Sequence, residues 1–566
     1  MANKLFWIPP SPRNHDYLVN FTNDLEQYTG EQWWPLYDRS LVSKTLIRSL
    51  TKHLPVEAHH RNVQGIKTLS YYDDYYNRVH ITPSLLELGN IASEQTETVN
   101  VWNAYLVPKT LLSIDDIPVG INVAGQPNPP LNFTALQERA WDISILTDGP
   151  SSLDETLTWK FTEDDAKLRI TGTRIIAFAW LVDWSKSVKE TLQWLTDILQ
   201  SNTGHEQRRS LRLAPRISLE ADLLLYDQER QFFDLAMLGW GAKTFAVPFW
   251  NQQQWLQTLH NSGSFVVFCD TTHRNFRSNR LALLRGQDAF DNETIEIESV
   301  LSDRLILKRP LIKTWSKGTC LSPAATTQLE SPPQLIKRTD RMMRCHLIFN
   351  LSESIDHSAS LPTTTYRNYP VFAEAPNERE DLTHSHERLL HVIENATGVS
   401  LKTDSAKAAF QLYRYQWLTH GRLSQANLRS FLYGLRGSQK AVWLPTFSDD
   451  LTLKATITST SQSMDVEWCG YTRFAVNQLG RQDIQITLKS GVVLFRRIIS
   501  STEINSQTER LLVDSIFPNQ ILTTDIIRIS FITLCRLSND TVSIEHVNDS
   551  DGVAKCSVVW RGVRES

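Results

Sequence analysis

The sequence predicts a mainly β, multi-domain protein, and three observations lead to this fold class. From Val79 onward, short segments with apolar residues at every second position follow one another about ten residues apart, which is typical of β-strands separated by turns. A long stretch in the middle of the chain is repeated about two hundred positions later. Helical spacing is confined to connecting segments. We therefore expect an immunoglobulin-like β-sandwich and two tandem related β-rich modules, joined by helical connectors.

Residues 1–76 are predicted to form an adaptor segment with one helix. The helix is expected over residues 37–53, where Leu46 and Leu50 belong to an apolar face. Two aromatic clusters flank it, and we take them as candidate interface residues: Trp33, Trp34, Tyr71, Tyr72, Tyr75 and Tyr76. The tyrosines surround two acids, so they form either a sugar-binding surface or a loop that lies on a neighbouring domain.

Residues 77–180 carry the strand pattern of the predicted sandwich. In the segment TVNVWNAY, Val99 and Val101 alternate with polar or differently facing residues, as expected for a strand with one buried face. Similar segments cover residues 80–89, 120–126, 141–150, 155–161 and 167–178. The stretch contains no cysteine, so its core must be held by packing alone.

Residues 181–216 are predicted to be a helical connector that begins at Asp183. Ser187 and Glu190 have the spacing of a capping box. The apolar face of this helix would consist of Val188, Leu192, Leu195 and Leu199. A basic cluster follows, with Arg208, Arg209 and Arg212 as candidate interface residues and Arg216 beyond them. The cluster is either a solvated end of the helix or an inter-subunit salt-bridge patch.

Residues 217–350 and 437–566 are predicted to be two copies of one β-rich module. Both copies begin with a glycine and an apolar run into a proline flanked by aromatic residues. The matching landmarks are Pro248 with Pro445, Cys269 with Cys469, Cys345 with Cys556 and Cys320 with Cys535, at separations of 197, 200, 211 and 215 positions. Because these landmarks keep their order and approximate spacing, a duplicated domain explains them better than chance.

Residues 351–436 are expected to contain a linker or arm followed by two helices. The polar, Pro/Ser/Thr-rich part up to residue 391 is predicted to lie across another surface. Helices are predicted over 404–418 and 424–435, and Gly437 is the expected terminator of the second. The order of helix, glycine, proline between aromatics, and strands then occurs in both halves of the chain.

Composition narrows the classes of function. The 566-residue chain has a net charge of −4, from 58 Lys and Arg against 62 Asp and Glu, which disfavours nucleic acid or an anionic membrane as the main partner. Neither a signal peptide nor an apolar run long enough to span a membrane is recognised, so we expect synthesis in the cytoplasm. The six cysteines are expected to be reduced and packed in the core. The seventeen tryptophans are expected to fill cores or to lie at protein or sugar contacts.

The search for catalytic motifs favours a protein without enzymatic activity. In HSHERLLH, His391 lies five positions after His386, whereas a zinc-protease helix requires a spacing of four around the glutamate. The neighbouring acids Asp449 and Asp450 would point to opposite faces of a strand, which disfavours a glycosidase pair. Nucleophile-elbow and phosphate-loop motifs are not found. We therefore expect no catalytic residue, no metal and no cofactor.

Several sequence segments resemble segments of a widespread group of tail-tip proteins of tailed bacteriophages, which includes baseplate-hub and distal-tail proteins. They are TVNVWNAYLVPKTL, RITGTRIIAF with the later DW, KETLQWLTDILQSNTGHEQRRSLRLAPR, WLPTFSDDLTL and DTVSIEHVNDSDGVAKCSVVWRGV. The resemblance covers residues 80–566. It implies a structural protein of the virion that forms a ring at the junction of tail tube and tip and takes part in host attachment and DNA ejection.

The resemblance also implies partners. A tail tube has sixfold symmetry and its tip is often threefold, so three chains with two modules each would present six similar surfaces. We therefore expect self-association, as a trimer or alternatively a hexamer, and contacts with other tail proteins. Two other functions remain open. One is a receptor-binding protein that uses the tyrosine-rich loop to bind host glycan, and the other is an envelope-polymer hydrolase that depends on Glu387.

Overall fold

The computed structural model describes most of the chain from residue 75 onward. The described residues are 57–58, 61–62, 75–91, 94–146, 149–150, 152–162, 164–548 and 552–564. Strands β1 (Glu57–Ala58) and β2 (Arg61–Asn62) pair with each other. The predicted helix over 37–53 and the candidates Trp33, Trp34, Tyr71 and Tyr72 lie outside the described residues. The described part is mainly β, as predicted, and divides into two compact units between Ile175 and Ile176.

The N-terminal unit is a β-sandwich of two sheets. One sheet has the order β3-β5-β9-β7 and the other β8-β6-β10-β11-β4, with β4 parallel to β11. The strands are β3 (Val79–Thr82), β4 (Leu85–Ile91), β5 (Gln95–Asn103), β6 (Lys109–Asp115), β7 (Ile121–Ala124), β8 (Leu131–Phe133), β9 (Glu138–Ile145), β10 (Ser152–Phe161) and β11 (Asp165–Ala177). Its immunoglobulin-like character stays a prediction.

Alternation explains how this sandwich closes. Val99 and Val101 point inward from β5 and are fully buried, as are Ile143 and Ile145 of β9. They meet Trp159 and other inward residues of the second sheet in one apolar cluster. Since each strand shows one face to this cluster and the other to water, the period of two in the sequence sets the fold of the unit.

The C-terminal unit contains the same strand arrangement twice. We call residues 188–351 repeat 1 and residues 383–562 repeat 2. Repeat 1 consists of β12 (Val188–Gln193), β13 (Thr196–Gln200), β14 (Glu206–Ser210), β15 (Arg216–Tyr226), α5 (Asp227–Ala236), the 3-10 turn η2 (Met237–Ala242), β16 (Thr244–Pro248), η3 (Trp250–Gln252), β17 (Gln254–Trp255), β18 (Val266–Phe268), β19 (Leu281–Arg285), β20 (Asn292–Leu301), β21 (Arg304–Leu307), β22 (Cys320–Leu329), β23 (Gln334–Lys337) and β24 (Met342–Leu351).

Repeat 2 follows the small hairpin β25 (Thr365–Tyr366) and β26 (Tyr369–Pro370). It consists of β27 (Thr383–Ile393), β28 (Leu401–Thr419), α6 (Arg422–Leu435), β29 (Val442–Pro445), β30 (Ser463–Glu467), α7 (Tyr471–Phe474), β31 (Asp483–Leu488), β32 (Val493–Asn505), β33 (Thr508–Val513), η4 (Thr523–Asp525), β34 (Ile526–Leu537), β35 (Thr541–His546) and β36 (Ala554–Gly562). In both repeats one helix lies between the long strand and the proline-ended strand.

Nine strand pairings of repeat 1 recur in repeat 2, whereas the pairings β13–β14 and β17–β22 have no counterpart among the described strands of repeat 2. Repeat 1 pairs β12 with β15, β15 with β24, β24 with β22 and β23, β22 with β16 and β19, β19 with β20, and β21 with β20 and β18. Repeat 2 makes the same pairings with β27, β28, β36, β34, β35, β29, β31, β32, β33 and β30 in these places. The two halves of this unit therefore share one topology.

Register settles which landmarks are equivalent. Pro248 pairs with Ala324 and Pro445 with Ile532, so Thr327 takes the place of Cys535 three residues further on. The predicted match of Cys320 with Cys535 is therefore wrong. Thr327 in turn pairs with Leu351 and Cys535 with Gly562. Counting back six residues from each places Cys345 opposite Cys556 in the alignment, which confirms that predicted match.

Two predicted helices are strands. Residues 183–200, expected to be a helix, contain β12 and β13, and residues 404–418 lie within β28. The first prediction failed because Glu190 points into the core at an alternating position, so the strand period is hidden by a buried charge. The predicted capping box of Ser187 and Glu190 does not exist in this strand. The helix predicted over 424–435 is confirmed by α6.

Candidate functional site

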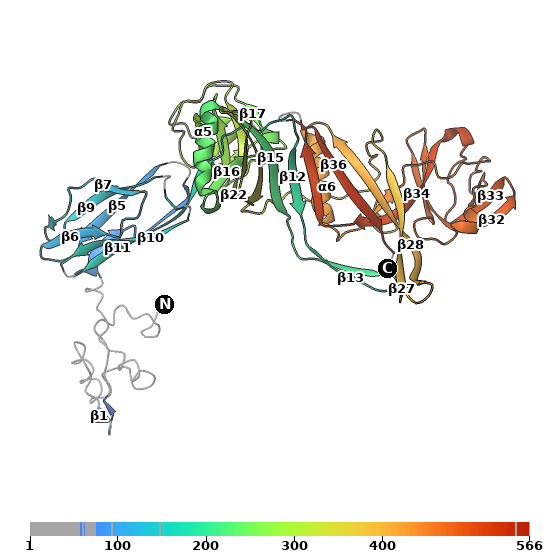
Figure 1. Ribbon diagram of the computed structural model, residues 1–566, viewed down its shortest axis with the longest axis horizontal. Helices are drawn as coiled ribbons and strands as arrows, with labels where there is room; N and C mark the ends of the chain where they lie inside the picture. Colours follow the sequence, from blue (N-terminus) through green and yellow to red (C-terminus); the bar gives the residue numbers. More distant parts are fainter. Residues whose placement is uncertain are drawn as a thin grey trace. The chain divides into compact units, whose positions relative to one another are not determined.

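The two repeats of the C-terminal unit are joined by a strand pair. β12 of repeat 1 runs antiparallel to β35 of repeat 2, from Val188 opposite His546 to Gln193 opposite Thr541. Through this pair the strands follow one another in the order β23-β24-β15-β12-β35-β36-β28-β27. Figure 1 shows β12 beside β15, with β36 and α6 of repeat 2 on its other side. One antiparallel sheet therefore continues from repeat 1 into repeat 2.

A buried ion pair lies at the centre of this junction. Glu190 of β12 accepts hydrogen bonds from Arg429 of α6 at 2.5 and 2.7 Å and from Nε2 of His546 of β35 at 3.0 Å. Gln425 of α6 donates to Nδ1 of His546 at 2.8 Å, which fixes the proton of the neutral ring on Nε2. The three ionisable side chains come from both repeats and all are buried. None was singled out as a site residue from the sequence.

The protonation states follow from this environment. Burial would by itself raise the pKa of Glu190, but the charge of Arg429 and the hydrogen bonds from His546 and Arg429 hold the pKa well below its usual range. Burial lowers the pKa of His546, against the opposing effect of Glu190. The junction therefore holds one carboxylate, one guanidinium and a neutral imidazole. Charged partners with their hydrogen bonds made are the arrangement in which burial is tolerated.

Asp540 provides a second link across the junction. Its carboxylate accepts hydrogen bonds from the backbone N–H of Thr196 at 2.5 Å, from the Thr196 hydroxyl at 2.8 Å and from the N–H of Ser438 at 2.8 Å. Beside it, the rings of Trp194 and Tyr433 pack edge to face with centroids 5.9 Å apart. These contacts connect the end of α6 to β13, the strand that follows β12.

The hairpin of β13 and β14 extends along repeat 2. Gly204 at its tip lies against the ring of Phe410 with a positive φ of +83°, so a side chain there has no room. Ser405 of β28 donates to the carbonyl of Asn202 at 2.9 Å. Figure 1 shows this hairpin running out of the sheet toward β27 and β28. Repeat 1 therefore contacts repeat 2 through this hairpin as well as through the pairing of β12 with β35.

The predicted basic cluster lies on and beside this arm, and not at a helix end. Arg208 pairs with Glu206 at 3.0 Å and donates to the carbonyl of Ser438 at 3.1 Å, and Glu206 also pairs with Arg561 at 2.8 Å. Arg212 donates to the carbonyls of Gln193 and Trp194. Arg209 is exposed. Arg208 and Arg212 thus make bonds within the chain. For Arg209, the role as an interface residue stays a prediction.

The same sheet ends in two edge strands. Within the described residues, β23 pairs with β24 alone and β27 with β28 alone. β27 is exposed over nearly its whole length and carries Leu390, Val392 and Ile393 in the open. Ile336 of β23 is also exposed. Edge strands with unpaired backbone groups are templates for pairing with another chain.

Tyr75 and Tyr76 are the predicted aromatic candidates that the structure describes. The ring of Tyr75 meets Trp102 edge to face at 5.7 Å, and His80 stacks on the same indole at 5.4 Å. Tyr76 packs against Tyr75 and Trp102. Tyr75 is exposed, as the receptor-binding hypothesis requires. The cluster contains two rings that were not predicted as candidates, His80 of β3 and Trp102 of β5.

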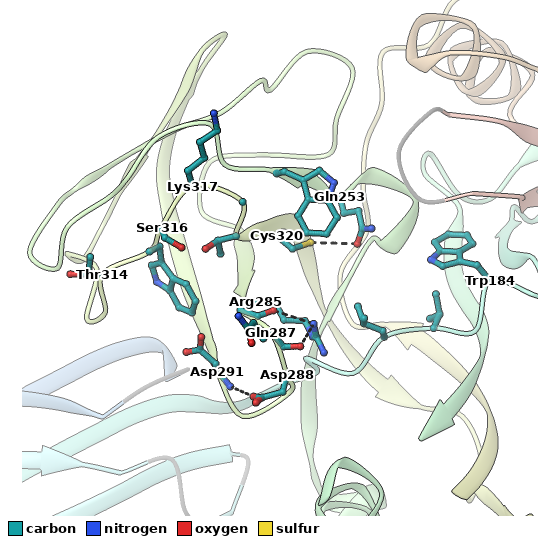
Figure 2. A pocket seen from close by; sticks show the side chains of 17 residues that line it. Trp184, Gln253, Arg285, Gln287, Asp288, Asp291, Thr314, Ser316, Lys317 and Cys320 are labelled. Atoms are coloured by element: carbon teal, nitrogen blue, oxygen red, sulfur yellow. Dashed lines mark hydrogen bonds between the residues drawn. The ribbon is translucent and has the colours of Figure 1, made fainter. Parts of the chain in front are cut away.

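A hollow of about 800 Å³ opens in repeat 1 and is shown in Figure 2. Its walls are the turn after β19 and the segment before β22, and Trp184 lines it from a third segment. Asp288 accepts hydrogen bonds from two backbone N–H groups of its own turn, and Asp291 pairs with Lys313 at 3.0 Å. Arg285 donates to the carbonyl of Ala179 at 2.7 Å. These charged groups stabilise the loops that form the hollow.

The histidine-rich segment is strand β27 and not the loop that was expected. The rings of His384 and His386 lie 4.6 Å apart, and burial lowers the pKa of His384 to about 4. Glu387 pairs with Arg561 at 3.2 Å. Asp449 and Asp450 accept hydrogen bonds from backbone N–H groups of β34, which gives them a structural role. Across the described residues, no three His, Cys, Asp or Glu side chains form a group able to hold a metal ion.

The cysteines are free, and four of the six are buried. Cys269 is half-buried and Cys469 is exposed, so the expectation of core packing is wrong for Cys469. In the described part of the chain, no helix is long and apolar enough to cross a membrane. The chain matches no protein-family model and no curated protein.

Proposed function

We propose that this chain is a structural assembly protein whose two repeats are units of a ring. The observation that carries the proposal is the junction between β12 and β35, through which one edge of a repeat receives the opposite edge of the next. The edges β27 and β23 remain available for the same type of contact. A surface that joins head to tail in this way gives a closed ring when the rotation between copies closes and an open filament when it does not, and the ring is the form that we propose.

As the particular place of this ring, we propose the tip of a bacteriophage tail, where tube and tip meet. The two structurally equivalent repeats support this proposal because three chains would present six similar faces to a sixfold tube and three to a threefold tip. The resemblance of the sequence to tail-tip proteins points the same way. In this position the protein takes part in host attachment and DNA ejection, with other tail proteins as its partners, and has no catalytic role.

Native mass and electron microscopy test the ring. Light scattering of the purified protein over a range of concentrations is expected to give three times the chain mass of 64.9 kDa, and negative-stain images should show closed rings. Six chains per ring would favour a distal-tail ring instead. Particles that remain monomeric at the highest concentration would contradict self-assembly of the isolated chain.

Labelling of whole particles tests the place of the ring. Antibodies raised against the purified chain are expected to bind at one end of the tail of intact phage, as seen with immunogold electron microscopy. Label on the capsid, or virions that lack the chain by mass spectrometry, would contradict the proposed location while leaving the ring itself unaffected.

A second candidate function is receptor binding, favoured by the cluster of Tyr75, Tyr76, His80 and Trp102 on the sandwich. Exposed aromatic rings with nearby polar groups are typical of sugar contacts. Binding of host glycans on an array should then fall on Tyr75→Ala and Trp102→Ala together. An array without signal for the unchanged protein would exclude this function.

A further inference from the structure

The two open edges of the sheet have equivalents inside the chain that are already paired. When the two repeats are aligned by their strand registers, residues 188–193 of β12 are equivalent to residues 382–387 at β27. The pairings of β23 with β24 and of β35 with β36 place residues 332–337 at the positions of 541–546. The edge β27 is therefore a second β12, and the edge β23 is a second β35.

We propose that β27 of one copy of this chain pairs antiparallel with β23 of the next copy, as β12 pairs with β35 within the chain. This inference rests on the proposed ring and names the surface that closes it. Transferring the register of the internal pair sets Leu382 opposite Lys337, Thr383 opposite Ile336 and Ser385 opposite Gln334. The occupant of each edge is thus a second copy of the same chain.

The helix that covers the strand pair supports the same occupant. Inside the chain, α6 lies over β12. Its twelfth residue, counted from Arg422 as the first, is Tyr433, and this side chain is buried. The residue at the same place after the start of α5 is Leu238, which is 81% exposed. Leu235 beside it is 68% exposed. An apolar pair in the open is explained if β27 of another copy covers it.

The polar side chains that meet at the junction are replaced by a different polar pair at the open edges. Within the chain, an acid on the strand (Glu190) meets a base on the helix (Arg429). At the open edges His384 takes the place of Glu190 on the strand, and Asp234 takes the place of Arg429, since both are the eighth residue of their helices. Lys337 takes the place of His546. The neutral ring of His384 can donate a hydrogen bond to the Asp234 carboxylate of the next copy, so a donor and an acid again meet, with the acid now on the helix.

Two prolines limit the length of the new pair. Pro332 and Pro333 directly precede β23, and Pro333 takes the place of Val542 of β35. Because proline has no N–H to donate, pairing between copies is confined to residues 334–337. The contact between copies is therefore shorter in its backbone bonds than the junction within the chain, and depends more on α5.

A disulfide trap tests the register directly. In a Cys469→Ser background, Thr383→Cys and Ile336→Cys are combined in one chain, and mild oxidation is expected to give chains linked to one another in nonreducing gels. The matched control combines Ile336→Cys with Val392→Cys, an exposed residue of β27 outside the proposed pair. Equal cross-linking in both, or none in the first when the protein is a ring, would overturn the register.

Mixing tests whether the contact is head to tail. Leu382→Glu introduces a charge where Val188 is buried at the internal junction, and Leu238→Glu introduces one in η2, directly after α5. Each variant alone is expected to be monomeric at concentrations at least about tenfold above those at which the unchanged protein assembles. A mixture of the two variants retains one intact pair of edges and should form species of two chains. Leu259→Glu, another exposed leucine of repeat 1, serves as the control that leaves assembly unchanged.

The outcomes separate this inference from the proposed function. If rings form and neither variant weakens them, the edges are not the contact, although the ring proposal stands. If the single variants dissociate but their mixture does not associate, the contact is not head to tail and the inference is wrong. Asp234→Arg with His384→Glu rebuilds the internal charge order between copies and is expected to assemble better than Asp234→Arg alone. Failure of this rescue would contradict the assigned places of the two residues.

Discussion

The junction of β12 with β35 and the edges β27 and β23 have the same backbone design but carry different side chains. At the junction, Glu190 of repeat 1 is 1% exposed, and its charge is compensated by Arg429 of repeat 2. At the edges the equivalent positions carry His384 and Lys337, which lie at the surface, and Leu235 of α5 and Leu238 of η2 remain exposed. A permanent contact thus accepts a fully buried ion pair, whereas a surface that must stay soluble until assembly carries polar side chains that water can hydrate.

The largest effect is expected from breaking the buried ion pair. Arg429→Met leaves the Glu190 carboxylate buried without its main partner, which should reduce the free energy of unfolding by about 3–5 kcal/mol. Urea unfolding measures the loss. Adding Glu190→Gln removes the stranded charge and should recover part of it.

An exposed pair on the sandwich provides the control for this prediction. Arg169 and Asp154 lie 2.8 Å apart with both side chains more than half exposed. Arg169→Met is expected to change the unfolding free energy far less than Arg429→Met does, since exposed pairs are screened by water and contribute little. Equal losses in Arg429→Met and Arg169→Met would show that burial at the junction has no special role.

The next effect is expected at Asp540. Asp540→Ala leaves two backbone N–H groups and one hydroxyl at the junction without their acceptor, which should cost about 2 kcal/mol in urea unfolding. The hairpin of β13 and β14 should also become more sensitive to protease. Asn539→Ala changes the neighbouring residue, which accepts a bond from its own turn, and should have a much smaller effect.

Acid should weaken the junction in a defined window. Burial lowers the pKa of His546 below its ordinary 6.5, so the unfolded chain takes up a proton that the folded chain does not as the pH falls through that value. Stability is therefore fully present above pH 6.5 and decreases toward the lower folded pKa. Glu190, whose pKa is also lowered, adds a second decrease below its ordinary 4.5.

Comparison with His546→Gln isolates the histidine. Between pH 6.5 and 5, the unfolding free energy of the unchanged protein should fall more steeply, by up to about 1.4 kcal/mol per pH unit, than that of the variant. Thermal unfolding at a series of pH values measures both slopes. Identical slopes would mean that His546 has the same pKa in the folded and the unfolded chain, which would contradict the prediction.

The smallest effect is expected from Glu387→Ala. Arg561 retains its bond of 2.8 Å to Glu206 after this change, and Glu387 is partly exposed, so the loss should stay below about 1 kcal/mol. Glu206→Ala removes a carboxylate that pairs with both Arg208 and Arg561 and should destabilise more. The hydrolase hypothesis makes a separate prediction for Glu387→Ala, which is loss of activity against purified cell wall.

Part of the fold was predictable because it depends on local periodicity. The strands of the sandwich and the helix over 424–435 follow directly from alternating and helical spacing. The duplication was visible because Pro248 and Pro445 end equivalent strands beside aromatic residues. The repeats nevertheless begin earlier than predicted, at β12 and β27, because residues 183–200 and 404–418 had apolar spacings close to those of helices.

Less of the candidate site than of the fold could be predicted from the sequence. Aromatic and basic residues attract attention by type, and Tyr75 does lie exposed on the sandwich. Arg208 was a candidate for the same reason, its residue type, but it is bonded to Glu206 and Ser438 within the chain. Glu190, Arg429 and His546 are separated by more than a hundred positions each, and no local pattern connects them.

The sequence by itself determined the mainly β class, the alternation that buries one face of each sandwich strand, and the existence of two related copies. These are properties of neighbouring residues and of repeated order along the chain. Tertiary structure decided which edges of the repeats meet, which charges are buried, and that β27 and β23 remain open. Strand edges offer the same backbone groups whatever their sequence, so their partners are selected by side chains that only folding brings together.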